Sequence, residues 1–130
     1  MKYLISDNAD SLIHVSSGQL LNQKNFVHKR RNLDTFVIII CIKGILYIAQ
    51  DDQRYTLTEN QFLILFSGHE HYGYRECSED LSYYWCHFRI QDDKFRIIRD
   101  KEMEKIFDAN VLTRGGGGGG GGAGGGRARG

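Results

Sequence analysis

Hydrophobic residues occur along the chain in short runs, which polar or glycine-containing turns separate at intervals of about ten residues. Runs of this length that are rich in Val, Ile, Phe and Tyr are typical of an all-β sandwich or barrel. We expect strands near residues 11–15, 25–28, 35–43, 45–50, 54–57, 62–66, 71–75 and 81–90. The pattern therefore predicts an all-β domain.

Turns between these strands have recognisable residues. Asp51 to Gln53 separate two apolar runs, and aspartate tolerates the backbone conformations of tight turns, so we expect a hairpin there. Gly44 interrupts an otherwise continuous apolar stretch, which predicts a bulge or bend. The run Phe36–Ile42 does not alternate between apolar and polar residues, so we expect both of its faces to be buried.

The run Leu81–Ile90 contains the densest group of aromatic residues. Side chains alternate along a strand, so Tyr83, Trp85 and His87 share one face of it. An aromatic plate between groups with polar tips can bind a sugar-like or other polyol ligand. The alternative is that these aromatic residues fill a core.

Beyond Ile90 the pattern predicts a helix. Asp100 can cap it, and Met103, Ile106 and Phe107 follow at spacings of three and four residues. Because a short helix with one apolar stripe must pack against something to be stable, we expect it to form an interface. Residues 115–130 are almost all glycine, and we interpret them as a linker or as stand-ins for unidentified residues.

Composition narrows the class of protein. The 130 residues contain 17 Lys and Arg against 16 Asp and Glu, a net charge of +1, which is too small a charge for a nucleic-acid grip. Three cysteines without a paired spacing fit reduced thiols in the cytoplasm better than disulfides. The amino terminus lacks the apolar stretch of a secretion signal, and the longest apolar run is far shorter than a membrane helix, so we expect no membrane contact.

One histidine pattern suggests metal chemistry. His69 and His71 would point to the same side of a strand, and His87 or Glu76 could complete a metal shell. The alternative is that these histidines are exposed or hydrogen-bonded within a turn. Nucleophile elbows, phosphate loops and dinucleotide-binding motifs do not occur in the sequence.

The basic cluster His28 to Arg31 has two interpretations as well. Such a cluster is commonly a solvated strand end. Alternatively, one guanidinium enters the mouth of a cavity, where its fixed fork of donors can hold two hydroxyls or a carboxylate.

Several segments together resemble the amino-terminal sensing domain of AraC-type transcription regulators, over roughly Gln23 to Arg89. The segments that carry the resemblance are Arg30-Arg31, residues 35–44, residues 55–68, His71 to Tyr74, and the stretch YYWCHF at Tyr83 to Phe88. The resemblance implies a cupin-like β-barrel (a double-stranded β-helix) followed by one or two short α-helices. It also implies a homodimer, and DNA binding through a separate carboxy-terminal helix-turn-helix domain that this chain lacks.

Metal positions of the cupin pattern are mostly replaced here. Gly68 and His71 match its second motif, but Gln50 and Asp52 stand where its first motif has histidines, and Thr56 stands where a glutamate could. The resemblance therefore implies a metal-free sensor with no cofactor and no enzymatic activity. The alternative function is a metal-dependent cupin enzyme using His69, His71 and His87, and a dimerisation domain without ligand is a third possibility.

For the sensor, the resemblance places the effector, a sugar-like small molecule, in the barrel lumen against Trp85. It implies an effector-binding barrel at 1–90, a helical dimerisation segment at 91–114 and the glycine-rich tail at 115–130. We expect no catalytic residues. The expected ligand-binding residues are Arg30, Arg31, His71, Tyr74, Tyr83, Trp85 and His87.

Overall fold

The computed structural model describes residues 2–6, 9–77 and 79–106. The chain divides into two compact units. One unit contains His14–Arg89, and the other contains the described residues up to Ile13 together with those from Ile90 to residue 106.

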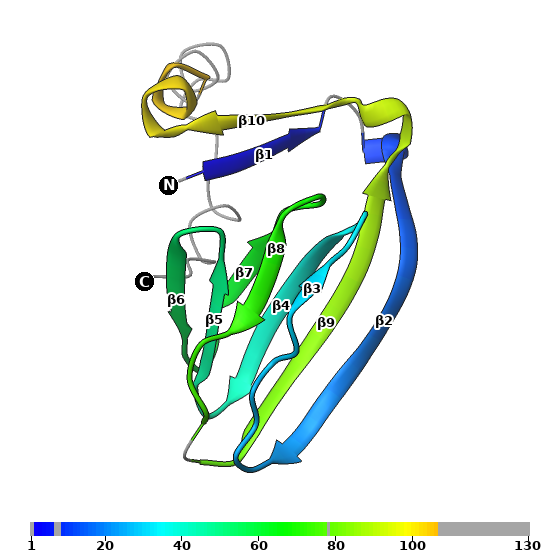
Figure 1. Cartoon of the computed structure of the whole chain (residues 1–130). Coiled ribbons are helices and arrows are strands. Elements are labelled where there is room, and N and C mark those ends of the chain that lie inside the picture. Colours follow the sequence, from blue (N-terminus) through cyan, green and yellow to red (C-terminus); the bar gives the residue numbers. More distant parts are fainter. Residues whose placement is uncertain (1, 7–8, 78, 107–130) are drawn as a thin grey trace. The chain divides into compact units, whose positions relative to one another are not determined.

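The His14–Arg89 unit is built from two four-stranded sheets. Their strands are β2 (Leu12–Gln23), β3 (Arg31–Asn32), β4 (Phe36–Lys43), β5 (Leu46–Gln50), β6 (Gln53–Leu57), β7 (Phe62–Leu65), β8 (Glu70–Gly73) and β9 (Leu81–Ile90). One sheet has the order β2-β9-β4-β7 and the other the order β3-β8-β5-β6. Figure 1 shows the second sheet in front of the first. This order, in which the first strand pairs with the last and the second with the last but one, is that of a double-stranded β-helix and confirms the cupin-like barrel.

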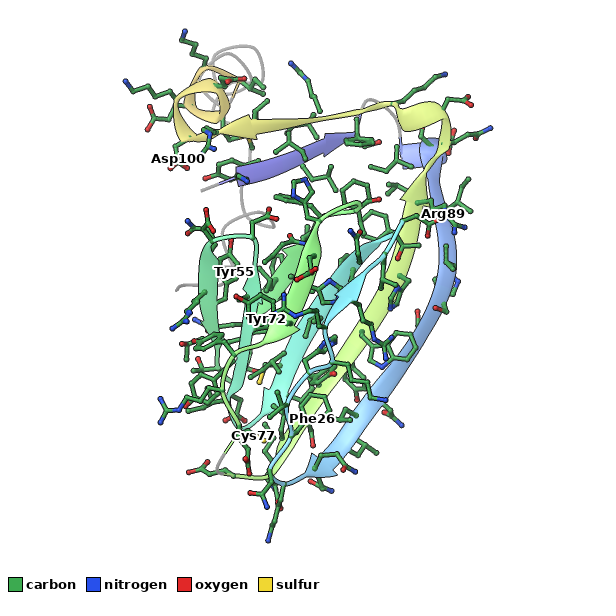
Figure 2. All side chains as sticks on the ribbon, in the orientation of Figure 1. Phe26, Tyr55, Tyr72, Cys77, Arg89 and Asp100 are labelled. Carbon is green, nitrogen blue, oxygen red and sulfur yellow. The ribbon has the colours of Figure 1, made fainter. Side chains whose placement is uncertain are left out.

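Both sheets contribute to one hydrophobic core, which Figure 2 shows as side chains filling the space between them. The side chains with almost no exposed surface are Ile39, Cys41, Leu46, Ile48, Leu57, Leu65 and Leu81. Each buried Leu or Ile stabilises the fold by about 1.5–3 kcal/mol. Burial also raises the pKa of the Cys41 thiol to about 11, so this cysteine serves as an inert packing group.

Both predicted turns are confirmed. Gln50 pairs with Gln53 across β5 and β6, which leaves Asp51 and Asp52 as a two-residue turn, with Asp51 at φ 52°. Gly44 lies between β4 and β5 at φ 81°, a left-handed conformation that favours glycine. An added Cβ there would lie 2.4 Å from the carbonyl oxygen of Asp80, so the bend also requires the absence of a side chain.

Two strand expectations were wrong. Residues 25–28 form no strand; instead the Cys77 N–H donates to the Phe26 carbonyl oxygen at 3.1 Å, and the Phe26 N–H donates to Sγ of Cys77 at 3.1 Å. Figure 2 shows these two residues close together near the lower end of the barrel. The first strand of the barrel is much longer than residues 11–15, because β2 extends to Gln23 alongside β9.

The expectation that both faces of 36–42 are buried was also wrong. Val37, Ile39 and Cys41 point into the core, but Ile40 and Ile42 are 41% and 37% exposed. The outward face of this run is also apolar, and it changes from buried at Phe36 to exposed at Ile40 and Ile42.

The second unit contains a pair of strands that the pattern did not predict. Strand β1 (Lys2–Ser6) pairs antiparallel with β10 (Phe95–Arg99). Two short 3-10 turns connect these strands to the barrel strands along the chain. The turn η1 (Ala9–Ser11) lies between β1 and β2, and η2 (Gln91–Asp93) lies between β9 and β10. Strand β1 belongs to the same unit as β10, and the expected extent of the barrel, residues 1–90, stays a prediction.

The predicted carboxy-terminal helix begins at Asp100, and its described part reaches residue 106. Met103 and Ile106 are half-buried while the residues between them are exposed. Phe107 and the glycine-rich segment 115–130 lie outside the described residues, and the division at residues 90 and 114 stays a prediction.

Candidate functional site

A cavity of about 240 Å³ lies within the barrel unit. At the density of liquid water this volume equals about eight water molecules, which is the size of a small organic molecule. The residues that line it are Leu20, Phe26, Val27, His28, Lys29, Arg31, Leu33, Val37, Ile39, His71, Tyr83, Trp85 and His87.

Strand β9 supplies the aromatic wall of the cavity. Tyr83, Trp85 and His87 alternate along it and therefore share its inner face, as the sequence predicts. On the neighbouring strand β4, Ile39 stands opposite Trp85 and Val37 stands opposite His87. Two adjacent strands thus place aromatic and aliphatic side chains in the same wall.

The indole of Trp85 is held in place by strand β2. A Cβ added at Gly18 would lie 2.3 Å from Cζ2 of Trp85, so this strand can approach the ring only at a residue without a side chain. The His87 ring packs against the indole edge-on, with 5.3 Å between the ring centroids. The indole is therefore fixed by its neighbours while it still lines the cavity.

Polar groups of the cavity also come from the other sheet and from the segment that precedes β3. Arg31 of β3 and His71 of β8 are directly opposed in the strand pairing. The His28 ring packs against His71 with a centroid distance of 5.1 Å, and its Nδ1 donates to the carbonyl oxygen of Lys29 at 2.7 Å. Three basic or imidazole side chains therefore lie together at this wall.

His87 completes the polar group from strand β9. Its Nδ1 lies 2.9 Å from the hydroxyl oxygen of Thr35, which fixes the orientation of the ring. Its Nε2 has no hydrogen-bond partner among the described residues. The second ring nitrogen of His87 is thus available for a ligand.

Burial keeps the three imidazoles neutral. It lowers the pKa of His71 from 6.5 to about 4, and the neighbouring His28 and the positive charge of Arg31 act in the same direction. Burial is also the main cause that lowers the pKa of His28 and of His87, to which the charge of Arg31 adds. Burial raises the pKa of Tyr83 to about 12, so its hydroxyl stays protonated. A neutral imidazole can donate one hydrogen bond and accept another.

The structure brings together five of the seven residues expected to bind a ligand. Arg31, His71, Tyr83, Trp85 and His87 all line the cavity. Whether they bind a ligand stays a prediction.

Arg30 is not among the cavity residues. Its guanidinium pairs with the carboxylate of Glu70 and lies over the ring of Tyr72, 3.9 Å from the ring centroid. Arg31, at the start of β3, is exposed but lines the cavity opposite His71, whereas Arg30 is held outside it by Glu70.

Tyr74 also lies outside the cavity lining. Its hydroxyl is 3.1 Å from that of Thr56 and donates to the carbonyl oxygen of Tyr55 at 3.3 Å. The guanidinium of Arg54 lies 5.0 Å from its ring centroid. Tyr74 therefore joins strand β6 to the end of β8.

The three histidines of the metal-enzyme alternative do not converge. His71 and His87 line the cavity, but His69 is 43% exposed and its Nδ1 lies 2.7 Å from the carboxylate of Asp51. Within the described ranges no group of three His, Cys, Asp or Glu side chains is placed to hold a metal ion.

Several cavity residues were not among those expected. His28 and Lys29 belong to the basic cluster that the sequence shows, but the pattern does not say which members turn inward. Val37 and Ile39 could have been found from their pairing with β9, once that pairing was known. Leu20 and Phe26 gave no signal, because they lie on or after a strand whose length was underestimated.

Two comparisons with known proteins point to the same family. Residues 14–99 match the family described as AraC-like ligand binding domain. A segment of 76 residues is 30% identical to the HTH-type transcriptional regulator YisR of Bacillus subtilis (strain 168), and it makes up 58% of this chain and 26% of that protein. The match thus spans about a quarter of that relative's length.

Solved structures with some similarity include two bacterial proteins. The plu4264 protein of Photorhabdus luminescens has a TM-score of 0.47 at 14% identity, over 85% of this chain and 83% of that one. The EutQ protein of Clostridium difficile has a TM-score of 0.46 at 14% identity, over 70% of this chain and 69% of that one. Among the described helical residues, no helix is long and apolar enough to cross a membrane.

Proposed function

Because this chain belongs to the family of AraC-like ligand-binding domains, we propose that the cavity beside Trp85 binds the small-molecule effector of a transcription regulator. The observation that carries the proposal is the cavity itself. It is of small-molecule size, and it combines an indole wall with imidazole, guanidinium and phenol groups.

A sugar-like effector is supported by the aromatic wall. The C–H surface of a sugar ring packs on an aromatic face, and its hydroxyls bond to polar neighbours. Trp85 lines the cavity with its indole, and Tyr83 and His87 lie two residues before and after it along β9.

Control of transcription would require parts outside this chain. In our proposal, a helix-turn-helix domain outside this chain contacts DNA, and the helix that begins at Asp100 contributes to a homodimer through Met103 and Ile106. Effector binding can change the arrangement of these parts only if one arrangement binds the effector more tightly than another.

We propose a binding role for the cavity and assign it no catalytic chemistry. The polar side chains at the cavity are neutral imidazoles, cations and a phenol, and Cys41 is a buried thiol with a raised pKa. Free thiols at Cys41, Cys77 and Cys86 support a reducing compartment such as the cytoplasm.

Calorimetry across a panel of sugars, glycosides and the corresponding sugar acids tests the proposed function. We expect at least one compound to bind, and Trp85→Ala to weaken its binding at least about tenfold, because about 1.4 kcal/mol of ring contact is lost. The matched control is Tyr84→Ala, since Tyr84 is the neighbouring aromatic residue on β9 and is 47% exposed. It should bind the compound as the parent chain does.

A compound that binds Trp85→Ala as tightly as the parent would contradict the proposal. Circular dichroism of each variant is the control for folding. A variant with the parent's spectrum that no longer binds has lost binding and not structure.

A further inference from the structure

The polar groups of the cavity are predominantly hydrogen-bond donors. Arg31 carries five N–H donors, Lys29 carries three and the indole of Trp85 carries one, and none of these side chains can accept. Among the described residues that line the cavity, none is acidic and none is Asn or Gln. Acceptors of the lining side chains are therefore limited to imidazole nitrogens and the Tyr83 hydroxyl.

The two cations that line the cavity, Lys29 and Arg31, are exposed to solvent and have no partners among the described residues. The side chains of Lys29 and Arg31 form no hydrogen bond or ion pair with any residue that the structure describes. The adjacent Arg30, by contrast, pairs with Glu70 outside the cavity. Positive charge at the cavity is therefore not neutralised by carboxylates of the barrel.

The positive charge of Arg31 affects the pKa of each imidazole that lines the cavity. Burial is the first cause that lowers the pKa of His28, His71 and His87, and the positive charge of Arg31 lowers each of them further. No acidic residue lines the cavity beside these rings. A negatively charged ligand would therefore be the group that balances the positive charge of Arg31. The same ligand would favour protonation of the imidazoles and so gain further donors.

A neutral polyol fits this donor excess poorly. Every sugar hydroxyl brings one donor hydrogen that needs an acceptor when it is buried. A carboxylate or similar oxyanion brings acceptors alone, and a guanidinium binds it with two parallel hydrogen bonds.

We infer that the effector is a small organic anion, whose carboxylate or other oxyanion group is bound by Arg31 and Lys29 while its carbon frame lies against Trp85. This inference rests on the proposed function and narrows the class of ligand. A hydroxylated organic acid, such as a sugar acid, satisfies both the indole wall and the donor-rich wall.

Fluorescence quenching tests the charge preference of the cavity without knowledge of the natural effector. Trp85 is the single tryptophan of the sequence, so its emission reports on this site. The probes are iodide, caesium and neutral acrylamide, compared at constant ionic strength. With each quenching constant divided by that of free N-acetyltryptophanamide, because caesium is intrinsically the weaker quencher, we expect iodide to quench Trp85 several-fold more strongly than caesium, since unpaired positive charge raises the local concentration of anions.

The matched variants are Arg31→Gln and Arg30→Gln, which remove adjacent arginines inside and outside the cavity. Arg31→Gln should lower the iodide quenching constant at least about twofold and leave acrylamide quenching unchanged. Arg30→Gln should leave both constants near the parent values. Equal normalised quenching by iodide and caesium, or equal effects of the two variants, would overturn the inference.

Acrylamide separates this inference from the proposed function. If acrylamide fails to quench Trp85, the cavity is closed to small molecules, and both proposals fail. If acrylamide quenches but iodide has no advantage, the cavity is open and the anionic effector alone is wrong. In a matched pair such as glucuronate and glucose, protection of Trp85 at lower concentration by the acid supports the inference, and better protection by the neutral sugar overturns it.

Discussion

His71 is the histidine of the cavity with the least exposed surface, at 3%. The charged groups around it are Arg31, its partner in the strand pairing, and the imidazoles of His28 and His87 when these are protonated. Burial and these positive neighbours disfavour the imidazolium form. The result is a pKa of about 4 in the folded chain, against an ordinary value of 6.5.

This shift predicts how stability changes with pH. Between pH 6.5 and 4 the unfolded chain binds a proton at His71 that the folded chain does not, so the free energy of unfolding falls as the pH falls through this window. The full shift corresponds to about 3 kcal/mol. Urea unfolding at pH 7.5 and pH 4.5 should show a smaller difference between the two pH values in His71→Asn than in the parent.

The control for this measurement is His14→Gln. His14 is exposed and its partner is the uncharged hydroxyl of Ser17, at 2.7 Å, so this variant should keep the parent's pH dependence. If His71→Asn loses as much stability on acidification as the parent does, burial of the neutral imidazole is not the cause.

Single residues of the site were predictable where strand alternation applies. The alternation within Leu81–Ile90 is local, so it placed Tyr83, Trp85 and His87 on one face before any fold was known. Arg30 and Arg31 could not be told apart, because Arg31 begins a two-residue strand whose register depends on its pairing with β8.

At the level of elements, two glycines in turns of the barrel differ in the space around them. Gly44 and Gly68 have nearly the same left-handed backbone, with φ of 81° and 79°. A Cβ at Gly44 would meet the carbonyl oxygen of Asp80 at 2.4 Å, whereas a Cβ at Gly68 has nothing within 4 Å. The pair therefore separates the cost of the conformation from the cost of crowding.

We expect Gly68→Ala to lower the free energy of unfolding by about 1–2 kcal/mol, which is the cost of a left-handed conformation in a residue with a Cβ. Gly44→Ala should cost about 1–3 kcal/mol more, because backbone atoms must also move to relieve the contact. Chemical denaturation measures both values. Equal losses in the two variants would show that the β4–β5 bend is not packed tightly against Asp80.

Strand predictions succeeded where a run is short and bounded by turns, as for β5, β6 and β7. They failed for β1 and β10, which pair with each other across almost the whole described chain. A pattern of period two describes one segment at a time, so it cannot show which distant segment supplies the partner strand. The same reason explains why the end of β2 was missed.

At the scale of the whole molecule, the barrel is assembled by distant pairings. Strand β2 pairs with β9 and β3 pairs with β8, so each wall of the cavity joins segments from both ends of the barrel unit. Composition and periodicity predicted the fold class. The cupin-like barrel came from the family resemblance, and the strand order came from the structure, because local patterns contain no information about these pairings.

The central claim is that a small molecule binds beside Trp85, and the indole N–H signal tests it directly. The sequence contains one tryptophan, so the ¹⁵N-labelled chain gives one indole Nε1–H resonance. Titration with a compound that binds in calorimetry should move this resonance until it saturates, with the Kd that calorimetry gives. A resonance that stays in place while the compound saturates the protein would show that the ligand binds elsewhere and would contradict the account.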